Sequence, residues 1–257
     1  MSLQGTLALV TGAAGDTGTA TCQALAQAGA TVIAAGRRHS ASVPGASEWV
    51  ELDVTSEDNW DRVIDLIQKR YGRLDILVNN AGINRIEKFE DVSLESWRAT
   101  QAVNVEGVFL GIQRALPLLK QSGPNRRGGA SVINISSIAG LVGAELNSAY
   151  CASKGAVRLL TKALALEFSA LGYRIRVNSI HPGGINTGMV ESIFQASVDL
   201  GLLDSRETAR QLATAAHPLG RLAEPTEIAA GIRFLASCES SYMQGSELTI
   251  DGGYTAR

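Results

Sequence analysis

The stretch Thr6-Leu-Ala-Leu-Val-Thr-Gly-Ala-Ala-Gly-Asp-Thr-Gly18 decides the fold, because it joins a short apolar run to a glycine-rich turn. A segment of helical period, from Gly18 to Ala28, follows the turn directly. Small residues at such a turn let the backbone approach a diphosphate, whose charge is favoured by the amides and dipole of the helix. The stretch predicts a strand, a phosphate-binding turn and a helix, although a tight turn without any ligand would have the same pattern.

The rest of the chain alternates short Val- and Ile-rich runs with longer stretches of helical period, which is typical of βαβ units. The nearly continuous apolarity of these runs indicates strands that are buried on both faces of a parallel sheet. We predict an α/β fold with one doubly wound Rossmann-type sheet of about seven strands and helices on both faces. The predicted strands are residues 6–10, 31–35, 49–52, 76–79, 131–135, 176–180 and 247–250. The predicted helices are residues 18–28, 58–71, 94–119, 148–171 and 226–236, with a loop over 37–48.

Composition narrows the class of protein. The chain has 257 residues, of which 45% are hydrophobic, and six prolines, so we expect a single domain over residues 1–257. A net charge of −2 provides no broad cationic surface, so neither nucleic acid nor a membrane is an expected partner. The Arg126-Arg127 pair is interpreted as part of a solvated loop.

The scattered cysteines and histidines point to a reducing compartment and no metal. Three cysteines without metal spacing, and a start that lacks a charged segment followed by a long apolar run, predict a cytoplasmic protein. The three histidines, His39, His181 and His217, are far apart and lack ligand spacing, so no metal site is predicted. His181 is interpreted as structural.

Tyr150 and Lys154 are the residues that can do chemistry. Four residues apart in a predicted helix, both side chains lie on one face. An ammonium beside a phenol favours the phenolate, so we expect Lys154, helped by a cofactor's positive charge, to lower the pKa of Tyr150. Ser137, next to Ser136, would hold the oxygen of the reacting alcohol or carbonyl, because a hydroxyl both donates and accepts. Since the spacing also occurs by chance, Tyr150 could instead be an ordinary helix tyrosine and Lys154 a solvated charge.

The end of the second predicted strand, Gly36-Arg37-Arg38, bears on the choice of cofactor. An NAD site usually has an acidic residue there, which binds the ribose hydroxyls. An arginine suits the 2′-phosphate of NADP, which a guanidinium can hold with two hydrogen bonds. The pattern favours NADP(H) over NAD(H). Asp16 is the counter-evidence, because its carboxylate could bind ribose hydroxyls or cap the helix.

Together these segments resemble the short-chain dehydrogenase/reductase family, in its single-domain branch, over almost the whole chain. The motifs that carry the resemblance are, in chain order, Thr11-Gly-Ala-Ala-Gly-Asp-Thr-Gly18, Asp53-Val54, Asn79-Asn-Ala-Gly82, Asn104, Ser136-Ser137, Tyr150-Cys-Ala-Ser-Lys154, Pro182-Gly183 and Asp251-Gly-Gly253. The chain departs from the family in two places. Asp16-Thr17 replaces the usual Gly-Ile, and Gly15 stands where NADP-preferring relatives often carry a basic residue.

The resemblance implies reversible hydride transfer between NAD(P)(H) and a secondary alcohol or ketone. Tyr150 would be the general acid/base, Lys154 would bind the nicotinamide ribose, Ser137 would orient the substrate, and Asn104 would hold a water that links Lys154 to solvent. Cofactor contacts are expected at Gly12, Asp16, Thr17, Gly18, Arg37, Arg38, Asp53, Val54, Asn80, Ala81, Gly82, Tyr150, Lys154, Pro182, Gly183, Ile185 and Thr187. Among these, Asp53 would reach the adenine, and Ile185 with Thr187 would hold the carboxamide.

The walls of the substrate pocket are expected at the carboxyl ends of the strands, from residues 141–147 and 188–218. The second segment carries apolar residues at roughly helical spacing, so it is interpreted as a helical lid, or else as core or subunit contacts. Glu145 is the charged residue nearest the expected mouth. The predicted substrate contacts are Ser137, Glu145, Tyr150, Gly184 and Met189.

Two other functions stay open beside the oxidoreductase. A dehydratase or epimerase on the same scaffold would usually need an added substrate-binding region. A non-catalytic NAD(P)-binding regulator would normally have a damaged active centre, whereas Asn104, Ser137, Tyr150 and Lys154 are all present. The resemblance also implies a homotetramer, which the small and apolar residues on several faces of the helix from Ser148 would allow.

Overall fold

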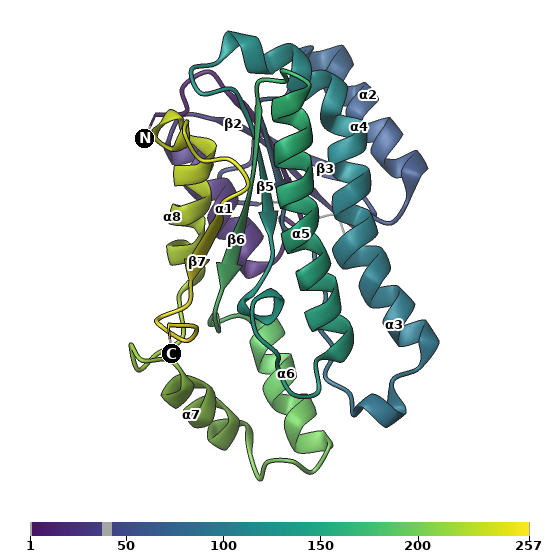
Figure 1. Ribbon diagram of the computed structural model, residues 1–257, viewed down its shortest axis with the longest axis vertical. Helices are drawn as coiled ribbons and strands as arrows, with labels where there is room; N and C mark the ends of the chain where they lie inside the picture. Colours follow the sequence, from purple (N-terminus) through teal and green to yellow (C-terminus); the bar gives the residue numbers. More distant parts are fainter. Residues whose placement is uncertain (1, 38–42, 257) are drawn as a thin grey trace.

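The computed structural model describes residues 2–37 and 43–256, which form a seven-stranded parallel sheet (Figure 1). The strand order is β3-β2-β1-β4-β5-β6-β7, so the predicted α/β fold is confirmed. Each strand lies within two residues of its predicted bounds, because Val- and Ile-rich runs mark buried parallel strands closely. The strands are β1 (Leu7–Thr11), β2 (Thr31–Gly36), β3 (Glu48–Glu51), β4 (Ile76–Asn79), β5 (Ala130–Ile135), β6 (Ile175–Pro182) and β7 (Glu247–Ile250).

Helices cover both faces of this sheet, as predicted. α1 and α8 lie on one face, and α2, α4 and α5 lie on the other (Figure 1). α6 and α7 extend beyond the carboxyl ends of the strands, at the bottom of Figure 1. The helices are α1 (Asp16–Gln27), α2 (Glu57–Tyr71), α3 (Leu94–Gln101), α4 (Gly107–Ser122), α5 (Ser148–Ala170), α6 (Gly188–Asp199), α7 (Arg206–Ala216) and α8 (Pro225–Ala236).

The single helix predicted over residues 94–119 is interrupted. α3 and α4 are joined by a π-helical turn, Ala102–Glu106, in which the helix widens by one residue. The apolar period continues through this turn, so the sequence pattern could not distinguish it from ordinary helix. The widened turn carries the buried side chain of Asn104, and π-helical turns are often found at functional sites.

The alternation of side chains along each strand divides the core into two layers. In β1, Leu7 and Leu9 pack in the layer under α2, α4 and α5, whereas Ala8 and Val10 pack in the layer under α1 and α8. Trp60 of α2 is completely buried in the first of these layers. Burial on both sides of the sheet fixes the register of the strands, and with it the position of their carboxyl ends.

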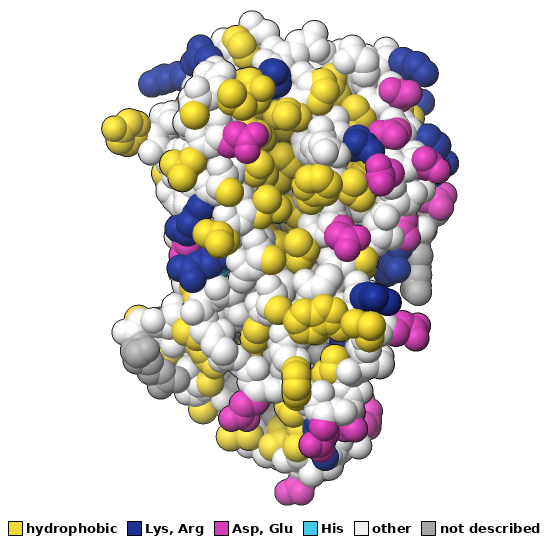
Figure 2. All heavy atoms as spheres, turned by 45° about the vertical axis from the view of Figure 1, so that its right-hand side comes forward, with side chains coloured by type: hydrophobic (Ala, Val, Ile, Leu, Met, Phe, Trp, Pro, Cys, Tyr) yellow, Lys and Arg dark blue, Asp and Glu magenta, His cyan; other side chains and the backbone are white. Residues whose placement is uncertain are grey.

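The outer face of α4 and α5 is apolar. Figure 2 shows hydrophobic side chains gathered along this side of the molecule. Phe109 of α4 and Leu159 and Leu166 of α5 are exposed there. Within the described ranges, no helix combines the length and apolarity that a membrane crossing requires.

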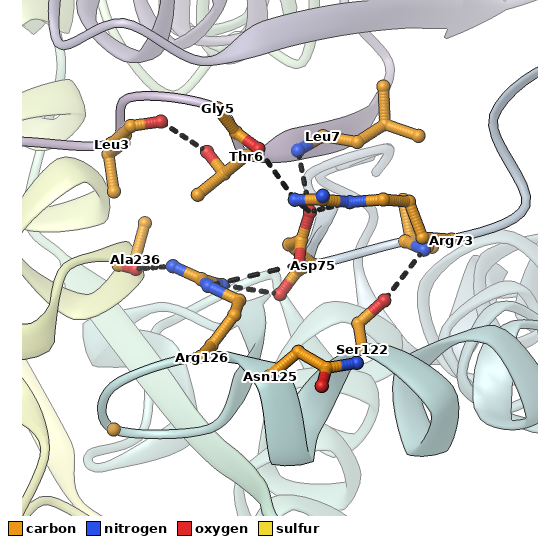
Figure 3. Close-up of polar contacts among 12 residues, drawn as sticks. Leu3, Gly5, Thr6, Leu7, Arg73, Asp75, Ser122, Asn125, Arg126 and Ala236 are labelled. Carbon is orange, nitrogen blue, oxygen red and sulfur yellow. Dashed lines mark hydrogen bonds and ion pairs between the residues drawn. The ribbon is translucent and has the colours of Figure 1, made fainter.

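The amino ends of the strands are held by a buried ionic network (Figure 3). The Asp75 carboxylate accepts from Leu7 N at 2.8 Å and from Arg73 Nη2 at 2.6 Å. Arg126 donates from Nη1 to the Asp75 carbonyl oxygen and from Nη2 to the Ala236 carbonyl oxygen. The Arg126 side chain is 10% exposed, and its Nε lies 3.9 Å from Asp75 Oδ1. Arg126 is therefore a structural residue, and the interpretation of a solvated Arg126-Arg127 loop was wrong for Arg126.

Arg176 is a second buried cation at this edge. Its guanidinium donates to the carbonyl oxygens of Gly128, Leu235, Ser237 and Ser240 and to the Ser240 hydroxyl. Several of these acceptors lie at the carboxyl end of α8, where a cation favours the helix dipole. Burial lowers the pKa of Arg176 to about 10, so the arginine stays charged at neutral pH.

Candidate active site

A cavity of about 500 Å³ opens at the carboxyl ends of β1, β4, β5 and β6, and α6 forms part of its wall. β1 and β4 are neighbours in the sheet although two strands separate them in the chain. At such a switch point the connecting segments leave toward opposite faces, and open α/β sheets bind their ligands in the crevice between them. The cavity is therefore where this fold is expected to do its chemistry.

The glycine-rich turn forms one end of the cavity and is clamped to β4. The backbone at Gly12 has a φ of 63°, and a Cβ at this position would lie 2.8 Å from Ala81 Cα. Asn80 Nδ2 donates to the carbonyl oxygens of Thr11 and Gly12, while the Thr11 hydroxyl accepts from the amides of Asn80 and Ala81. Only glycine fits position 12, and these bonds hold the turn against the end of the neighbouring strand.

Tyr150, Lys154 and Ser137 converge at the other end. The Ser137 side chain acts on the Tyr150 phenol in the direction that lowers its pKa, and its hydroxyl accepts from Ala139 N at 3.1 Å. Lys154 Nζ lies 5.5 Å from the centre of the Tyr150 ring and donates to the Ile135 carbonyl oxygen at 2.8 Å. The arrangement brings a proton donor, a hydroxyl that orients oxygen and a buried cation to one point.

Without a cofactor, the pKa of Tyr150 is raised. Burial raises the pKa of Tyr150 to about 12, and the Ser137 side chain opposes this only in part. Burial also lowers the pKa of Lys154 to about 8. The Lys154 ammonium hydrogen-bonds to the Ile135 carbonyl, so it does not offset the desolvation of the phenol. A phenolate at Tyr150 therefore requires a further positive charge beside it.

Asn104 lies behind Lys154 in the π-helical turn and does not line the cavity. Its Oδ1 accepts from Ile83 N at 2.9 Å, and its Nδ2 donates to Ile83 O and to Ser153 Oγ. A Cβ on Gly82 would lie 3.4 Å from Asn104 Oδ1 and 3.6 Å from Lys154 Nζ. The side chain joins the segment after β4 to α5 close to the Lys154 ammonium.

His181 contacts the backbone of Ser137. The completely buried imidazole pairs through Nδ1 with the Ser137 carbonyl oxygen at 3.0 Å and through Nε2 with Ser179 Oγ at 2.8 Å. Burial lowers the pKa of His181, so the ring is neutral at neutral pH. In the described part of the chain, no group of three His, Cys, Asp or Glu residues could hold a metal ion.

Most predicted site residues are brought together by the fold. The predicted cofactor residues that line the cavity are Gly12, Asp16, Thr17, Gly18, Asn80, Ala81, Gly82, Tyr150, Lys154, Pro182, Gly183, Ile185 and Thr187. The predicted substrate residues that line it are Ser137, Tyr150, Gly184 and Met189.

Other predicted residues lie outside the lining. Arg37 is exposed at the end of β2, and Asp53 accepts from Thr55 in the turn before α2. Val54 is buried in the core, and Glu145 is exposed in the loop before α5. Arg38 and His39 lie outside the described residues.

Sequence reasoning missed Asn84, Ile138 and Ala139, which also line the cavity. Each follows a motif that had been recognised, Asn84 shortly after Gly82 and Ile138 directly after Ser137. The signal was therefore their place just beyond strands β4 and β5, because any residue there faces the crevice. Ala144, Asn147, Val190 and Ile193 line the cavity from the predicted wall segments.

The residues around the cavity fit a dinucleotide. The turn at Gly12 leaves no room for a side chain between the backbone and β4. Gly15 at the N-cap of α1 provides no side-chain cap, so the first amides of that helix are left for an anion. At the far end, Lys154 is buried yet has a single acceptor among the described residues, which leaves donors for a bound ribose.

Comparison with known proteins agrees with this geometry. The sequence profile of a family described as enoyl-(acyl carrier protein) reductase matches residues 12–255. The chain belongs to the short-chain dehydrogenase/reductase family, as its motifs predicted.

Individual relatives are similar over nearly the whole chain. Cyclopentanol dehydrogenase of Comamonas sp. (strain NCIMB 9872) is 41% identical over 257 residues, which cover 96% of each protein. The NADP-dependent (R)-specific alcohol dehydrogenase of Lentilactobacillus kefiri is 36% identical, over 99% of this chain and 98% of the relative. A short-chain type dehydrogenase/reductase from Mycobacterium marinum, solved as a crystal structure, is 36% identical with a TM-score of 0.86, over 100% of this chain and 98% of that one. The protein is an NAD(P)-dependent oxidoreductase that transfers a hydride between its cofactor and an alcohol or ketone, which confirms the predicted activity.

Proposed function

We propose that this protein oxidises a secondary alcohol on an apolar ring, or reduces the matching ketone, with NADP(H) as its preferred cofactor. The observation that carries the proposal is the convergence of Ser137, Tyr150 and Lys154 at the end of a cavity whose other end is a phosphate-binding turn. A ligand that spans this cavity brings its reactive part next to the phenol.

Tyr150 acts as the proton donor and acceptor, and the bound nicotinamide supplies or accepts the hydride. In the reductive direction the phenol gives its proton to the carbonyl oxygen, which Ser137 holds through its hydroxyl. With a pKa near 12, the free-enzyme phenol is fully protonated at neutral pH and ready to donate. In the oxidative direction Tyr150 would lose that proton more readily beside a bound oxidised nicotinamide, which would carry a positive charge.

Lys154 positions the cofactor and passes the proton onward. Its buried ammonium, with a pKa near 8, can give up a proton near neutral pH. Asn104, close by in the π-helical turn, is proposed to hold the water through which Lys154 exchanges with solvent. Ile185 and Thr187 would hold the carboxamide, and Asn80 to Gly82 would line the adenosine side.

The apolar wall of the cavity supports a ring substrate. Ile138, Ala139, Met189, Val190 and Ile193 line it around the Ser137 and Tyr150 hydroxyls, so an uncharged hydrocarbon body is favoured there. Cyclopentanol dehydrogenase, the relative at 41% identity, is named for such an alcohol. α6 and α7 are proposed to act together as the substrate lid, since α6 contributes three of these side chains.

NADP(H) is proposed from Arg37, whose guanidinium is exposed at the end of β2 and can meet a 2′-phosphate. A relative with this preference is the NADP-dependent alcohol dehydrogenase of Lentilactobacillus kefiri. A homotetramer is proposed from the apolar outer face of α4 and α5, where Phe109, Leu159 and Leu166 would be covered by a second copy.

The test is an activity screen with both cofactors and a panel of cyclic, linear and sugar alcohols, read from the absorbance of reduced nicotinamide. We expect turnover of small cyclic secondary alcohols, with a lower KM for NADP than for NAD. Arg37→Ala should raise the KM for NADP about tenfold and leave that for NAD unchanged. Binding of cofactor without turnover of any alcohol or ketone would favour the non-catalytic regulator.

A further inference from the structure

Asp16 connects the glycine-rich turn before α1 to the start of α6. Its Oδ2 accepts from the backbone amide of Gly188 at 2.8 Å, although the two residues are 172 positions apart. Asp16 is the first residue of α1, and Gly188 is the first residue of α6. One carboxylate therefore sits between the amino ends of two helices, at the rim of the cavity.

At the start of each of these two helices, the N-cap residue offers the first backbone amide no side-chain acceptor. α1 has no side-chain cap, because its N-cap residue is Gly15. α6 has Thr187 at its N-cap, whose hydroxyl accepts from Val190 N at 3.4 Å and leaves the Gly188 amide to Asp16. The Asp16 carboxylate holds the first amide of α6 and lies beside the uncapped amino end of α1, where the dipoles of both helices favour a negative charge.

The carboxylate is also isolated in charge. Apart from Asp16, Lys154 is the one other charged residue among the described lining of the cavity, and it lies at the catalytic end. A diphosphate that enters the turn meets the negative charge of Asp16 beside it. Like charges at short range repel, and the exposed position of Asp16 moderates this repulsion through water.

We propose that Asp16 holds the start of α6 against the phosphate-binding turn in the free protein, and that its charge opposes the diphosphate of the cofactor. The proposal rests on the proposed function, because it assigns the turn to a dinucleotide. The carboxylate keeps the lid helix positioned, and it lowers the affinity for the cofactor through like-charge repulsion. Asp16, which replaces the small residue expected in this turn, is a positioning residue and acts through α6.

Asp16→Asn and Asp16→Ala separate the two parts of this role. Asparagine keeps an oxygen that accepts from Gly188 but removes the charge, whereas alanine removes both. We expect both variants to bind ADP and NADP about three- to tenfold more tightly than the wild type in calorimetric titrations. In the ligand-free protein, hydrogen exchange at the Gly188 and Met189 amides should be at least tenfold faster in Asp16→Ala, and nearly unchanged in Asp16→Asn.

Asp199→Asn is the matched control, because it removes the same charge from the opposite end of α6, where Asp199 accepts from Gln195. It should change neither the affinity nor the exchange. Weaker binding of ADP and NADP by both Asp16 variants would overturn the proposal and make Asp16 a direct ligand of the cofactor. Unchanged affinity and exchange would overturn it as well. If the affinities change as expected but no alcohol is oxidised, only the proposed substrate class fails.

Discussion

Buried cations have very different numbers of hydrogen-bond partners at the two ends of the strands. We call the side of the sheet where the strands begin the amino edge, and the side where they end the carboxyl edge. At the amino edge, the Arg176 guanidinium meets five acceptor atoms, and Arg126 and Arg73 both meet Asp75. At the carboxyl edge, the equally buried Lys154 ammonium meets one, the Ile135 carbonyl oxygen. At the amino edge, acceptors within the protein pair with each charge. At the carboxyl edge, the Lys154 ammonium keeps N–H donors without an acceptor, which lowers the stability of the protein.

This difference identifies the buried cation that can still donate hydrogen bonds to a ligand. A buried cation with all its donors paired has nothing left for a ligand, and it serves the fold. A buried cation with unused donors is destabilising on its own, and the cost is recovered when a ligand binds. The contrast therefore separates structural from functional charge without reference to any other protein.

Tyr150→Phe should produce the largest effect and tests the functional edge. Loss of the phenolic proton is expected to lower kcat by about 10³-fold or more, because Tyr150 is the proposed general acid and base. The dissociation constant for NADP, measured by calorimetry, should change less than threefold. A variant that keeps a tenth of the wild-type kcat would remove Tyr150 from the mechanism.

Asp75→Ala tests the structural edge. Removal of the carboxylate leaves Arg126 buried without its counter-charge, so we expect the free energy of unfolding to fall by about 3–5 kcal/mol. Urea unfolding measures this loss. The kcat of the folded fraction should stay within twofold of the wild type, since the network lies at the opposite end of the strands. A loss below about 1 kcal/mol would show that the network does not stabilise the fold.

Lys154→Met should raise the free energy of unfolding, whereas Asp75→Ala should lower it. The Lys154 pKa is near 8 in the folded protein and about 10.5 in the unfolded chain, so the unfolded chain binds more protons between these values. Wild-type stability should therefore rise with pH from about 8 upward, and Lys154→Met should lack this rise. At pH 7 the variant should be more stable by about 2–3 kcal/mol, and it should bind cofactor poorly.

The measurement for Lys154→Met is a set of urea unfolding curves between pH 7 and 9.5. Tyr150, whose pKa is raised to about 12, contributes a loss of stability only above pH 10, where the unfolded phenol ionises. Burial also raises the pKa of Cys22 to about 12, which lowers the stability of both proteins equally from about pH 9, so the difference between the two sets of curves isolates the lysine. Equal stabilities of the two proteins across this range would contradict the view that Lys154 is a destabilising buried charge.

Glu57→Gln should have the smallest effect, because it changes an exposed ion pair. Glu57 pairs with Arg114 on the surface of α2 and α4, where the glutamate side chain is 66% exposed. Screening by water should limit the change in unfolding free energy to about 0–1 kcal/mol. A loss as large as that of Asp75→Ala would mean that burial does not explain the difference between the two edges.

Local patterns predicted the fold and the position of most site residues. The strands and the turn at Gly12 were predicted because apolar runs and glycine positions are properties of neighbouring residues. Arg126 was misread because its partner Asp75 is 51 residues away. The π-helical turn at Asn104 was missed because it changes hydrogen bonds while the apolar period continues.

The chemistry of the site was less predictable than its membership. Spacing placed Tyr150 and Lys154 on one face of a helix, which the structure confirms. Spacing could not tell that the ammonium bonds to the end of β5. The Tyr150 pKa is raised in the cofactor-free protein, and its lowering beside a bound cofactor stays a prediction. The alternative that Asp16 caps its own helix was wrong, because its carboxylate accepts from Gly188 N at the start of α6, 172 residues later.

The acceptors that surround Arg176 have a consequence for synthesis of the chain on the ribosome. Those in α8 and the turn after it lie 59 to 64 positions downstream, so until these residues have been translated the guanidinium has only the Gly128 carbonyl oxygen among its acceptors. We expect nascent chains that end before residue 235 to remain sensitive to protease and full-length chains to resist it, with resistance of the shorter chains as the contrary result. We therefore expect the fold to be completed only after α8 has been translated.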